Sequence, residues 1–394
     1  MIHPRYAKLK HAENRLVARK NRIDRAYYDG VFDRYVDPVL TADHVPVEWR
    51  YDLDRETNPH FIERLGVNAV FNAGAIAFDG AYWLMARVEG KDRKSFFALA
   101  KSLDPVSGFR FVGRPVLWED RYPEETNVYD VRLVRHADGW IYGIYCAERK
   151  DPAAPAGDTS AAIARAGLFR TRNMVDFERL PDLETPSPQQ RNVVLHPEFV
   201  HGKYLLYTRP QDGFIETGAG GGIAFGFVDD MTRPVVAEEK ILDAKRYHTV
   251  YELKNGAGPA PIKTERGWIH VAHGVRNTAA GLRYVLYAFA TALDDPTRVV
   301  AKPSGYLLAP RGAERVGDVS NVLFANGAIV DGTDVYLYYA SSDTRLHVAG
   351  TTIARLADYV FENPSERFRS LDCAHQRADL ADHNEKILEG AKKK

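Results

Sequence analysis

Apolar stretches alternate with short polar turns along most of the chain, and five of these turns share one pattern. In each, an apolar run reaches a dipeptide of the form x-Gly and resumes as a strand rich in aromatic residues. The turns recur about every 60 to 65 residues, in segments 78–83, 137–142, 200–205, 265–269 and 330–336. Tight glycine turns join antiparallel strands, and a fixed period of this length indicates a repeat architecture.

Five such units of four strands each, closed into a ring, make a five-bladed β-propeller. The 394 residues would suffice for two average domains, but the repeat spans most of the chain. We therefore predict an all-β fold with one large closed domain, a five-bladed β-propeller over residues 46–362. N-terminal and C-terminal helical extensions are predicted over residues 1–45 and 363–394. A propeller brings residues that are distant in sequence to one axis.

The two ends of the chain carry the helical patterns. Residues 5 to about 28 place Leu9, Leu16, Ala18, Ile23 and Ala26 in a narrow apolar stripe among many charges. The segment from residue 365 onward is again charged and helical in pattern. Each helix must dock either on the propeller of its own chain or on another subunit. The pattern alone leaves both alternatives open, and we expect a homo-oligomer.

Composition and motifs exclude several classes of partner and chemistry. Lys and Arg number 53, as do Asp and Glu, so the chain lacks the basic excess expected of a nucleic-acid or membrane-surface protein. It has no apolar run of about 18 residues to span a bilayer and no apolar signal core, so we expect a cytoplasmic protein. The two cysteines have no metal-ligand spacing. The glycine-rich loops at 217–222 and 255–259 match no nucleotide-binding fingerprint. We expect no metal and no cofactor.

Polar residues flank the first hairpin of each repeat. The start of the first strand and the end of the second lie at the same end of an antiparallel pair, so these positions should meet at one mouth of the propeller. They are Asn72 with Arg87, Asp130 with Glu148 and Arg149, Arg191 and Asn192 with Arg209, Lys263 with His273, and Asn321 with Asp343. A single polar strand end is readily explained by contact with solvent. Five hairpins with the same feature favour a site.

This set of mouth residues is rich in cations. Arginines bind carboxylates and phosphates through two parallel hydrogen bonds, so a basic cluster in a neutral protein favours a small anion, above all phosphate. Local ion pairs between each arginine and a nearby carboxylate are the structural alternative. Asp130 opens a strongly apolar strand, and a desolvated carboxyl group can hold a proton near neutral pH. Inverting hydrolysis of a glycoside needs an acid and a base, whereas phosphorolysis needs only the acid.

At these residues the chain resembles glycoside hydrolase family 130, the inverting β-mannoside phosphorylases. The resemblance covers nearly the whole chain and is greatest to the branch that acts on 4-O-β-D-mannosyl-D-glucose. The segments that carry it are 49–53, 58–59, 68–75, 86–95, 129–132, 191–195, 207–210, 261–264, 273–275 and 339–344. One departure is Ala73, where family members often carry Ser or Pro.

The resemblance implies a role for each of these residues. Asp130 would be the general acid, passing its proton through the 3-hydroxyl of mannose to the glycosidic oxygen. Inorganic phosphate, a co-substrate, would be held by Arg191, Arg209, His273 and Tyr284. The substrate-binding set would be Asn72, Arg87, Tyr129 and Asp343, with Arg93 and Lys94 near the acceptor sugar.

Two rival functions remain open from the sequence. The first is a β-mannoside hydrolase that uses Glu148 or Asp343 as base, and the second is a propeller that binds sugars without turnover. Within the phosphorylase interpretation, mannose (as in β-1,4-mannooligosaccharides) or N-acetylglucosamine could replace glucose as the acceptor.

Overall fold

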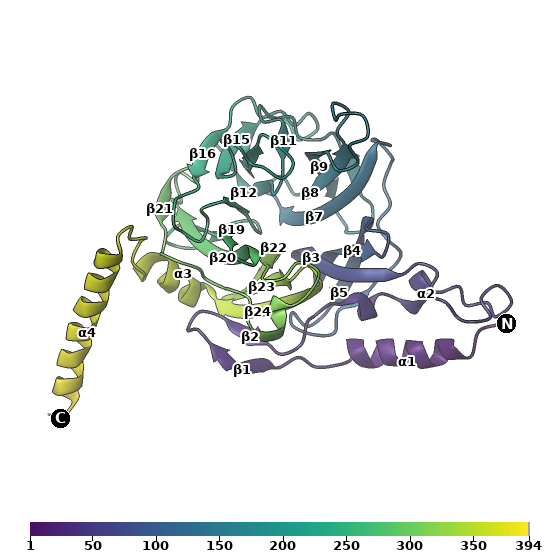
Figure 1. Ribbon diagram of the computed structural model, residues 1–394, viewed down its shortest axis with the longest axis horizontal. Helices are drawn as coiled ribbons and strands as arrows, with labels where there is room; N and C mark the ends of the chain where they lie inside the picture. The colour runs from purple at the N-terminus through teal and green to yellow at the C-terminus, as the bar shows by residue number, and fades with distance from the viewer. Residues whose placement is uncertain (393–394) are drawn as a thin grey trace.

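The computed structural model describes residues 1–392, in which five sheets of four or five strands surround a central axis (Figure 1). Blade 1 contains β3 (Val67–Phe78), β4 (Ala81–Gly90), β5 (Ser95–Ser102) and β6 (Arg110–Phe111). Blade 2 contains β7 (Glu125–Arg135), β8 (Ile141–Lys150), β9 (Ala162–Thr171) and β10 (Glu178–Leu180). Blade 3 contains β12 (Val194–Val200), β13 (Lys203–Thr208), β15 (Ile223–Val228) and β16 (Lys240–Asp243).

Blades 4 and 5 depart from this regular order. Blade 4 contains β17 (Lys254–Ala257), β18 (Ile262–Lys263), β19 (Trp268–Thr278), β20 (Gly281–Thr291) and β21 (Val299–Ala301), with β17 and β18 both paired to β19. Blade 5 contains β22 (Leu323–Asp331), β23 (Asp334–Ser341) and β24 (Arg345–Thr352). A separate two-stranded sheet joins β11 (Gln189–Gln190) to β14 (Pro210–Gln211).

The predicted five-bladed propeller with helices at both ends is confirmed. Each of the five x-Gly turns connects the inner part of a blade to its second strand. Gly80 and Gly139 have φ angles of 68° and 86°, a left-handed conformation that glycine adopts without a steric penalty. The sequence pattern therefore located the same turn in every blade.

The N-terminal segment closes the ring as the outer part of blade 5. Strand β2 (Asp33–Tyr35) pairs with β24, placing Arg34 opposite Ala349, and β1 (Ile23–Tyr28) pairs with β2. The helix predicted over residues 5–28 is therefore wrong beyond Val17, where α1 (Arg5–Val17) ends. The β-branched and aromatic ends of β1 suit a strand, and β2, once paired to β24, offers an edge with which β1 pairs.

The helices differ in how they contact the propeller. Helix α1 packs against η1 (Ala42–His44) and α2 (Val47–Arg50), and α3 (Ile353–Glu362) buries Leu356 and Val360. A short η2 (Gly312–Arg315) precedes β22. Helix α4 (Ser370–Lys392) contains no buried residue and projects away from the blades (Figure 1). The predicted C-terminal helix is thus present, and residues 393–394 lie outside the described chain. No helix within residues 1–392 combines the length and apolar character of a membrane span.

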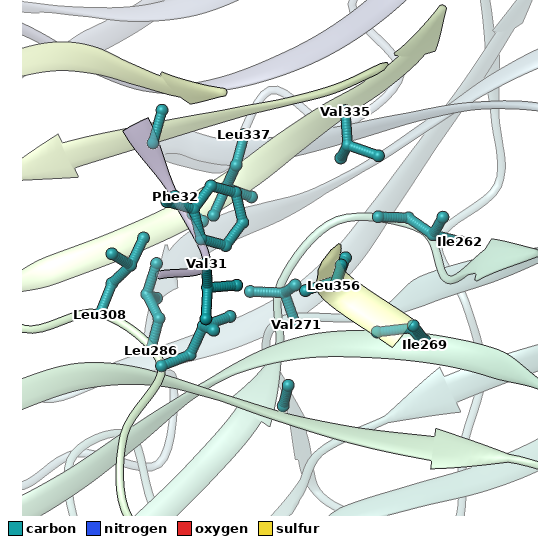
Figure 2. Packing of buried hydrophobic residues seen from close by; sticks show 14 of the residues in the cluster. Val31, Phe32, Ile262, Ile269, Val271, Leu286, Leu308, Val335, Leu337 and Leu356 are labelled. Atoms are coloured by element: carbon teal, nitrogen blue, oxygen red, sulfur yellow. The ribbon is translucent and has the colours of Figure 1, made fainter. Parts of the chain in front are cut away.

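The hydrophobic core lies between neighbouring blades rather than at the axis. One cluster contains Leu286 of blade 4 and Leu337 of blade 5 together with Phe32 and Leu356 (Figure 2). At the axis the inner strands approach too closely for large side chains. A Cβ atom at Gly327 would lie 2.6 Å from the Cβ of Ala75. This close packing fixes the inner strands, whose ends carry the polar mouth residues.

Candidate active site

One cavity of about 360 Å³ opens at the mouth where the first hairpins of the blades meet. All five blades contribute to its wall. Every predicted site residue except Lys94 lines it: Asn72, Arg87, Arg93, Tyr129, Asp130, Arg191, Arg209, His273, Tyr284 and Asp343. The mouth predicted from the hairpin geometry is therefore present as a single cavity.

Two β-bulges direct Asn72 and Asp130 into this cavity. The pairing register shifts between Phe71 and Gly74 in β3 and between Tyr129 and Arg132 in β7. At the shifts, Asn72 and Asp130 have φ angles of 47° and 62°. Asn and Asp tolerate this left-handed conformation better than most residues, and a bulge re-aims the side chain that it carries. As a result, Asn72 Nδ2 donates a hydrogen bond of 2.7 Å to Asp130 Oδ1.

Arg87 is held beside this carboxylate by contacts on every side. Its guanidinium lies between the rings of Phe71 and Tyr129, with centroid distances of 4.4 and 4.9 Å. Its Nη2 pairs with Glu89 at 2.7 Å. The remaining Nη1 lies 3.6 Å from Asp130 Oδ1. Because the aromatic rings restrict its movement, Arg87 presents a fixed donor toward Asp130 and the cavity.

Asp343 brings a second carboxyl group to the same wall. It lies in the turn between β23 and β24 and, like Ser342, has a left-handed φ of 49°. Burial, followed by the nearby charge of Asp130, raises the pKa of Asp343 to about 7, while Arg87 opposes the shift. A carboxyl group that is protonated over part of the neutral range can donate as well as accept a hydrogen bond. Asp343 therefore suits contact with a sugar hydroxyl.

Another part of the wall contains Arg191 and Arg209, two cations that lack carboxylate partners. Within residues 1–392, neither Arg191 nor Arg209 has a carboxylate oxygen within 4.0 Å. Arg209 Nη2 instead donates to Gln211, and its Nη1 lies 3.4 Å from His273 Nε2. Arg191 packs on the ring of Phe214 at 3.9 Å. The local ion pairs that the sequence left as an alternative are therefore absent from these two arginines.

Several buried donors in this part of the wall have no protein partner. They are the Nε atoms of Arg191 and Arg209 and the Nδ1 atom of His273. Burial and the charge of Arg209 hold the pKa of His273 well below its ordinary value, so the imidazole is neutral. Burial, followed by Arg209 and Arg191, lowers the pKa of Lys254 to about 8. Positive charge and unused donors without a counter-ion make a site for an anion.

Three of the mouth residues named from the sequence do not line the cavity. Arg149 pairs with Glu125 and Asp182, and Lys263 pairs with Glu198. Asn321 lies outside the lining set. Arg149 and Lys263 therefore form local ion pairs, the structural alternative that the sequence left open.

Lys94 faces a different cavity from its neighbour Arg93. This second cavity, of about 430 Å³, is lined by Lys94 with Trp49 and Phe96. Arg93 has a left-handed φ of 67°, which turns the loop so that consecutive side chains face different cavities. The two residues could not be separated from sequence because the turn conformation decides their direction.

Sequence reasoning missed several residues of the wall, of which Lys254 matters most. The others are Glu89, Asn127, Cys146, Leu282, Val319, Val322 and Phe324. Lys254 begins β17, the inner strand of blade 4, which is interrupted before β18. The sequence pattern places the start of the hairpin at Lys263 of β18, whereas the inner strand of blade 4 begins at Lys254. The glycine-rich loop after Lys254 was the available signal.

Comparison with known proteins identifies the family. A family model described as β-1,4-mannooligosaccharide phosphorylase, for glycoside hydrolase family 130, matches residues 43–362. The chain belongs to glycoside hydrolase family 130. Among family 130 relatives, it is 56% identical over 390 residues to the 4-O-β-D-mannosyl-D-glucose phosphorylase of Bacteroides fragilis, covering 98% of this chain and 99% of that protein. It is 35% identical over 347 residues to the β-1,4-mannooligosaccharide phosphorylase of Ruminococcus albus, covering 82% and 94%.

A solved structure supports the family 130 fold. The β-1,2-mannobiose phosphorylase of Listeria innocua, in complex with β-1,2-mannobiose, superposes with a TM-score of 0.65. It is 20% identical and covers 82% of this chain and 97% of that chain. Helices α1 and α4 both lie outside the span that the family 130 model matches, whereas the Bacteroides fragilis relative covers nearly the whole chain.

Proposed function

We propose that this chain catalyses the inverting phosphorolysis of 4-O-β-D-mannosyl-D-glucose, giving α-D-mannose 1-phosphate and D-glucose. The observation that carries the proposal is one cavity that joins a carboxyl group, Asp130, to a cluster of cations without counter-ions. The substrate is inferred from the Bacteroides fragilis relative, which is 56% identical. The acid, the anion site and the related chain all support the same reaction class.

In this mechanism phosphate attacks the anomeric carbon of mannose from the face opposite glucose. The bond from that carbon to the glycosidic oxygen breaks as the bond to a phosphate oxygen forms. Asp130 supplies the proton that the leaving glucose needs, through the 3-hydroxyl of mannose. Asn72 holds the carboxyl group in place through its 2.7 Å hydrogen bond. General acid help of this kind contributes about 10²–10⁴-fold in rate.

Phosphate would be held by the residues of the cationic wall. Arg191, Arg209, His273 and Tyr284 form the set that the family resemblance implies, and we add Lys254. A Lys254 with a pKa of about 8 still carries charge in most molecules at neutral pH. Neutral His273 can donate one hydrogen bond from the nitrogen that has no protein partner. The combined positive charge suits a dianion.

The part of the wall that contains Asp130 and Asp343 would hold the sugars. Arg87 and Asp343 would bind hydroxyl groups of mannose, with Tyr129 beside them, and Arg93 would lie near the acceptor. Lys94 lines the neighbouring cavity, so a role for it at the acceptor requires the loop that carries it to move. The cavity wall also contains Glu148, the candidate base of a rival hydrolase.

The reverse reaction tests the proposal and the choice of acceptor together. The enzyme is incubated with α-D-mannose 1-phosphate and glucose, mannose or N-acetylglucosamine, and released phosphate is measured. We expect release to be fastest with glucose, with a β-1,4-linked disaccharide as product. Faster release with mannose or N-acetylglucosamine would reassign the acceptor. No release with any sugar would leave a hydrolase or a non-catalytic binding protein.

We also propose that the chain forms a homo-oligomer through α4. Leu380 and Ile387 are spaced for one face of this helix and are 58% and 55% exposed. Most helical stability in proteins comes from the packing of an apolar face, and α4 buries no residue against its own chain. A second copy of the chain offers a surface for such packing: the groove between α1 and α2, a cavity of about 560 Å³ with an apolar floor that includes Leu9 and Leu16.

Charge complementarity supports this partner. Arg15, Arg19 and Arg50 line the groove together with Glu13 and Asp43. Arg19 and Arg50 already pair with Asp37 and Glu63, so Arg15 is the cation that carboxylates of α4 can face. Those carboxylates are Asp372, Asp379, Asp382, Glu385 and Glu389. The groove and α4 lie at opposite ends of one chain in Figure 1, so the α4 that fills the groove comes from another copy.

A further inference from the structure

Arg132 is a buried arginine beneath the cavity that has no counter-ion and no part in the proposed chemistry. It follows Asp130 by two residues in β7, is 3% exposed, and is absent from the cavity wall. Bound substrate or phosphate therefore cannot touch its guanidinium without rearrangement. Burial of a charge that forms no ion pair costs free energy, so Arg132 is expected to serve a function that offsets this cost.

The guanidinium of Arg132 joins three blades through neutral acceptors. Its Nη1 donates to the backbone oxygen of Asp130 at 2.6 Å, within blade 2. Its Nη2 donates to Asn192 Oδ1 at 2.8 Å, at the start of blade 3, and to the backbone oxygen of Ala257 at 3.2 Å, in blade 4. Its Nε donates to the backbone oxygen of Gly258 at 3.3 Å. None of these acceptors carries a charge.

Other buried arginines of the described chain are neutralised by carboxylates. Arg34 pairs with Glu314 at 2.5 Å, and Arg179 pairs with Glu125 and Asp182 at 2.8 and 2.5 Å. Arg132 and Arg209 form no such ion pair within residues 1–392. Arg209 lines the cavity, and Arg132 lies behind its wall, bonded to Asp130 and Asn192, which do line it. Among the buried arginines of the described chain, the two that form no ion pair therefore lie in or next to the proposed phosphate site.

The positive charge of Arg132 acts on two residues of the proposed phosphate site, Arg209 and His273. It is among the causes that lower the pKa of Arg209 and of His273, so its field acts on both of these groups. Burial lowers the pKa of Arg132 itself to about 10, although the nearby charge of Asp130 opposes the shift, and Arg132 stays protonated at neutral pH. Arg132 would attract a phosphate dianion bound next to Arg209, because the two charges have opposite signs.

We propose that Arg132 is a positioning residue whose uncompensated positive charge strengthens phosphate binding from beneath the cavity, while its hydrogen bonds hold Asp130 and Asn192 in place. This inference rests on the proposed phosphorolysis. The charge and the hydrogen bonds make separate predictions, because a lysine keeps the charge but loses the fork of donors, whereas a glutamine keeps two donors and loses the charge.

The test compares Arg132→Lys with Arg132→Gln in steady-state phosphorolysis. For Arg132→Gln we expect the KM for phosphate to rise roughly tenfold to a hundredfold, as loss of one charge at a low effective dielectric would give, and the KM for the disaccharide to change far less. Arg132→Lys should recover most of the affinity for phosphate. Its kcat should still be reduced, because the carbonyl of Asp130 loses part of its support.

Arg34→Gln is the matched control, since it removes a buried arginine whose charge is already neutralised. It should lower thermal stability and leave the KM for phosphate unchanged. An Arg132→Gln enzyme with a normal KM for phosphate would overturn the proposal, as would equal losses of phosphate affinity in the Lys and Gln variants. If neither variant folds cooperatively, Arg132 serves the architecture alone and the proposal is also overturned.

The proposed function can fail separately from this inference. If the wild-type enzyme does not consume phosphate at all, the phosphorylase assignment is wrong. If it does, and only the Arg132 comparison fails, the error is confined to Arg132.

Discussion

At the scale of single residues, the site depends on backbone conformations that most residues avoid. Asn72, Asp130 and Asp343 all have left-handed φ angles, and two of them lie on β-bulges of inner strands. Such strain persists only where the surrounding structure enforces it, and it is common at functional sites. The close packing of the inner strands supplies that enforcement here. The chemistry of the site is therefore best tested by substitutions that keep backbone shape.

Replacement of Asp130 by asparagine should abolish most of the activity without unfolding the protein. Asparagine tolerates the left-handed conformation and its oxygen can still accept the hydrogen bond from Asn72, but it cannot supply a proton. We expect kcat to fall by about 10²–10⁴-fold or more, with an unchanged circular dichroism spectrum. Asp79→Asn is the control, because Asp79 has a similar φ of 50° in a turn outside the cavity. Near-normal turnover by Asp130→Asn would remove Asp130 from the role of acid.

Replacement of Arg209 by alanine should act mainly on phosphate. Arg209 is buried without a carboxylate partner, so its charge is available to an anion. Initial-rate measurements should show a large rise in the KM for phosphate and a much smaller rise for the disaccharide. Arg149→Ala removes an arginine that Glu125 and Asp182 already neutralise, and it should not produce this split. Equal rises in both KM values for Arg209→Ala would mean that Arg209 does not chiefly hold phosphate.

Asp343 should limit stability at neutral and alkaline pH. Its pKa is raised in the folded protein to about 7, against about 3.9 in an unfolded chain. The stability that protonated Asp343 contributes is complete below about pH 4 and is lost as pH rises to about 7. Asp343→Asn does not titrate, so its free energy of unfolding should increase relative to wild type over that interval and stay level above it. Urea unfolding at pH 4 and pH 8 measures the difference, and a constant difference would contradict the assignment.

At the scale of elements, the blades were predictable where local chemistry decides the structure. In four of the five x-Gly turns the glycine has a left-handed φ between 61° and 86°, which depends little on the surroundings, so Gly80 and its equivalents marked the blades. The strand at Ile23–Tyr28 could not be predicted in the same way, because it forms on the β2 that pairs with β24, more than 300 residues away. Lys254 was missed for a related reason, since the inner strand of blade 4 is split by a loop.

The site was predictable to the extent that it lies at the ends of hairpins. Asp130, Arg191 and Arg209 were located from the antiparallel geometry and the charges alone. Their environment was not, because burial and the absence of carboxylate partners depend on contacts between blades. The same geometry selected Arg149, which local carboxylates neutralise. Lys94, which came from the family resemblance rather than from this geometry, was turned away by the loop conformation.

The closing strand β2 should depend on its buried ion pair more than on its half-buried one. Arg34 pairs with Glu314 and also donates to the backbone oxygen of Ala309, with 4% of its side chain exposed. Arg355 pairs with Asp33 on the same strand, with both side chains 31% exposed. Removing one partner of a buried pair costs about 3–5 kcal/mol, whereas an exposed pair contributes about 0–1 kcal/mol. Urea unfolding should therefore show a far larger loss for Arg34→Ala than for Arg355→Ala, and equal losses would contradict this difference.

At the scale of the whole molecule, the chain combines a family propeller with two helices that the family model does not include. Helix α1 packs on its own chain and leaves a groove lined by both charged and apolar residues, and α4 buries no residue within the described chain. The central cavity draws on all five blades, so anything that loosens the ring affects every part of the site. Self-association through α4 would leave the cavity intact and change only the number of sites in each assembly.

If the chain assembles through α4 as proposed, charged substitutions on the apolar positions of α4 should give single chains. The double variant Leu380→Glu and Ile387→Glu should shift the mass measured by light scattering to that of one chain, while Leu103→Glu, at a site 82% exposed elsewhere, should not. Arg15→Glu should weaken the assembly, and Asp379→Arg with Asp382→Arg should restore it. A monomeric wild type would contradict the proposal. So would an assembly that responds to changes in α4 but not to those in the groove.

The most direct test of the central claim is the dependence of disaccharide cleavage on inorganic phosphate. Mannosyl-glucose is incubated with the enzyme in buffers with and without phosphate, and the products are followed by ³¹P and ¹H nuclear magnetic resonance. We predict that glucose and α-D-mannose 1-phosphate appear together, in equal amounts, and only when phosphate is present. Release of free mannose in the phosphate-free buffer would show that water is the attacking group and would contradict the proposed function.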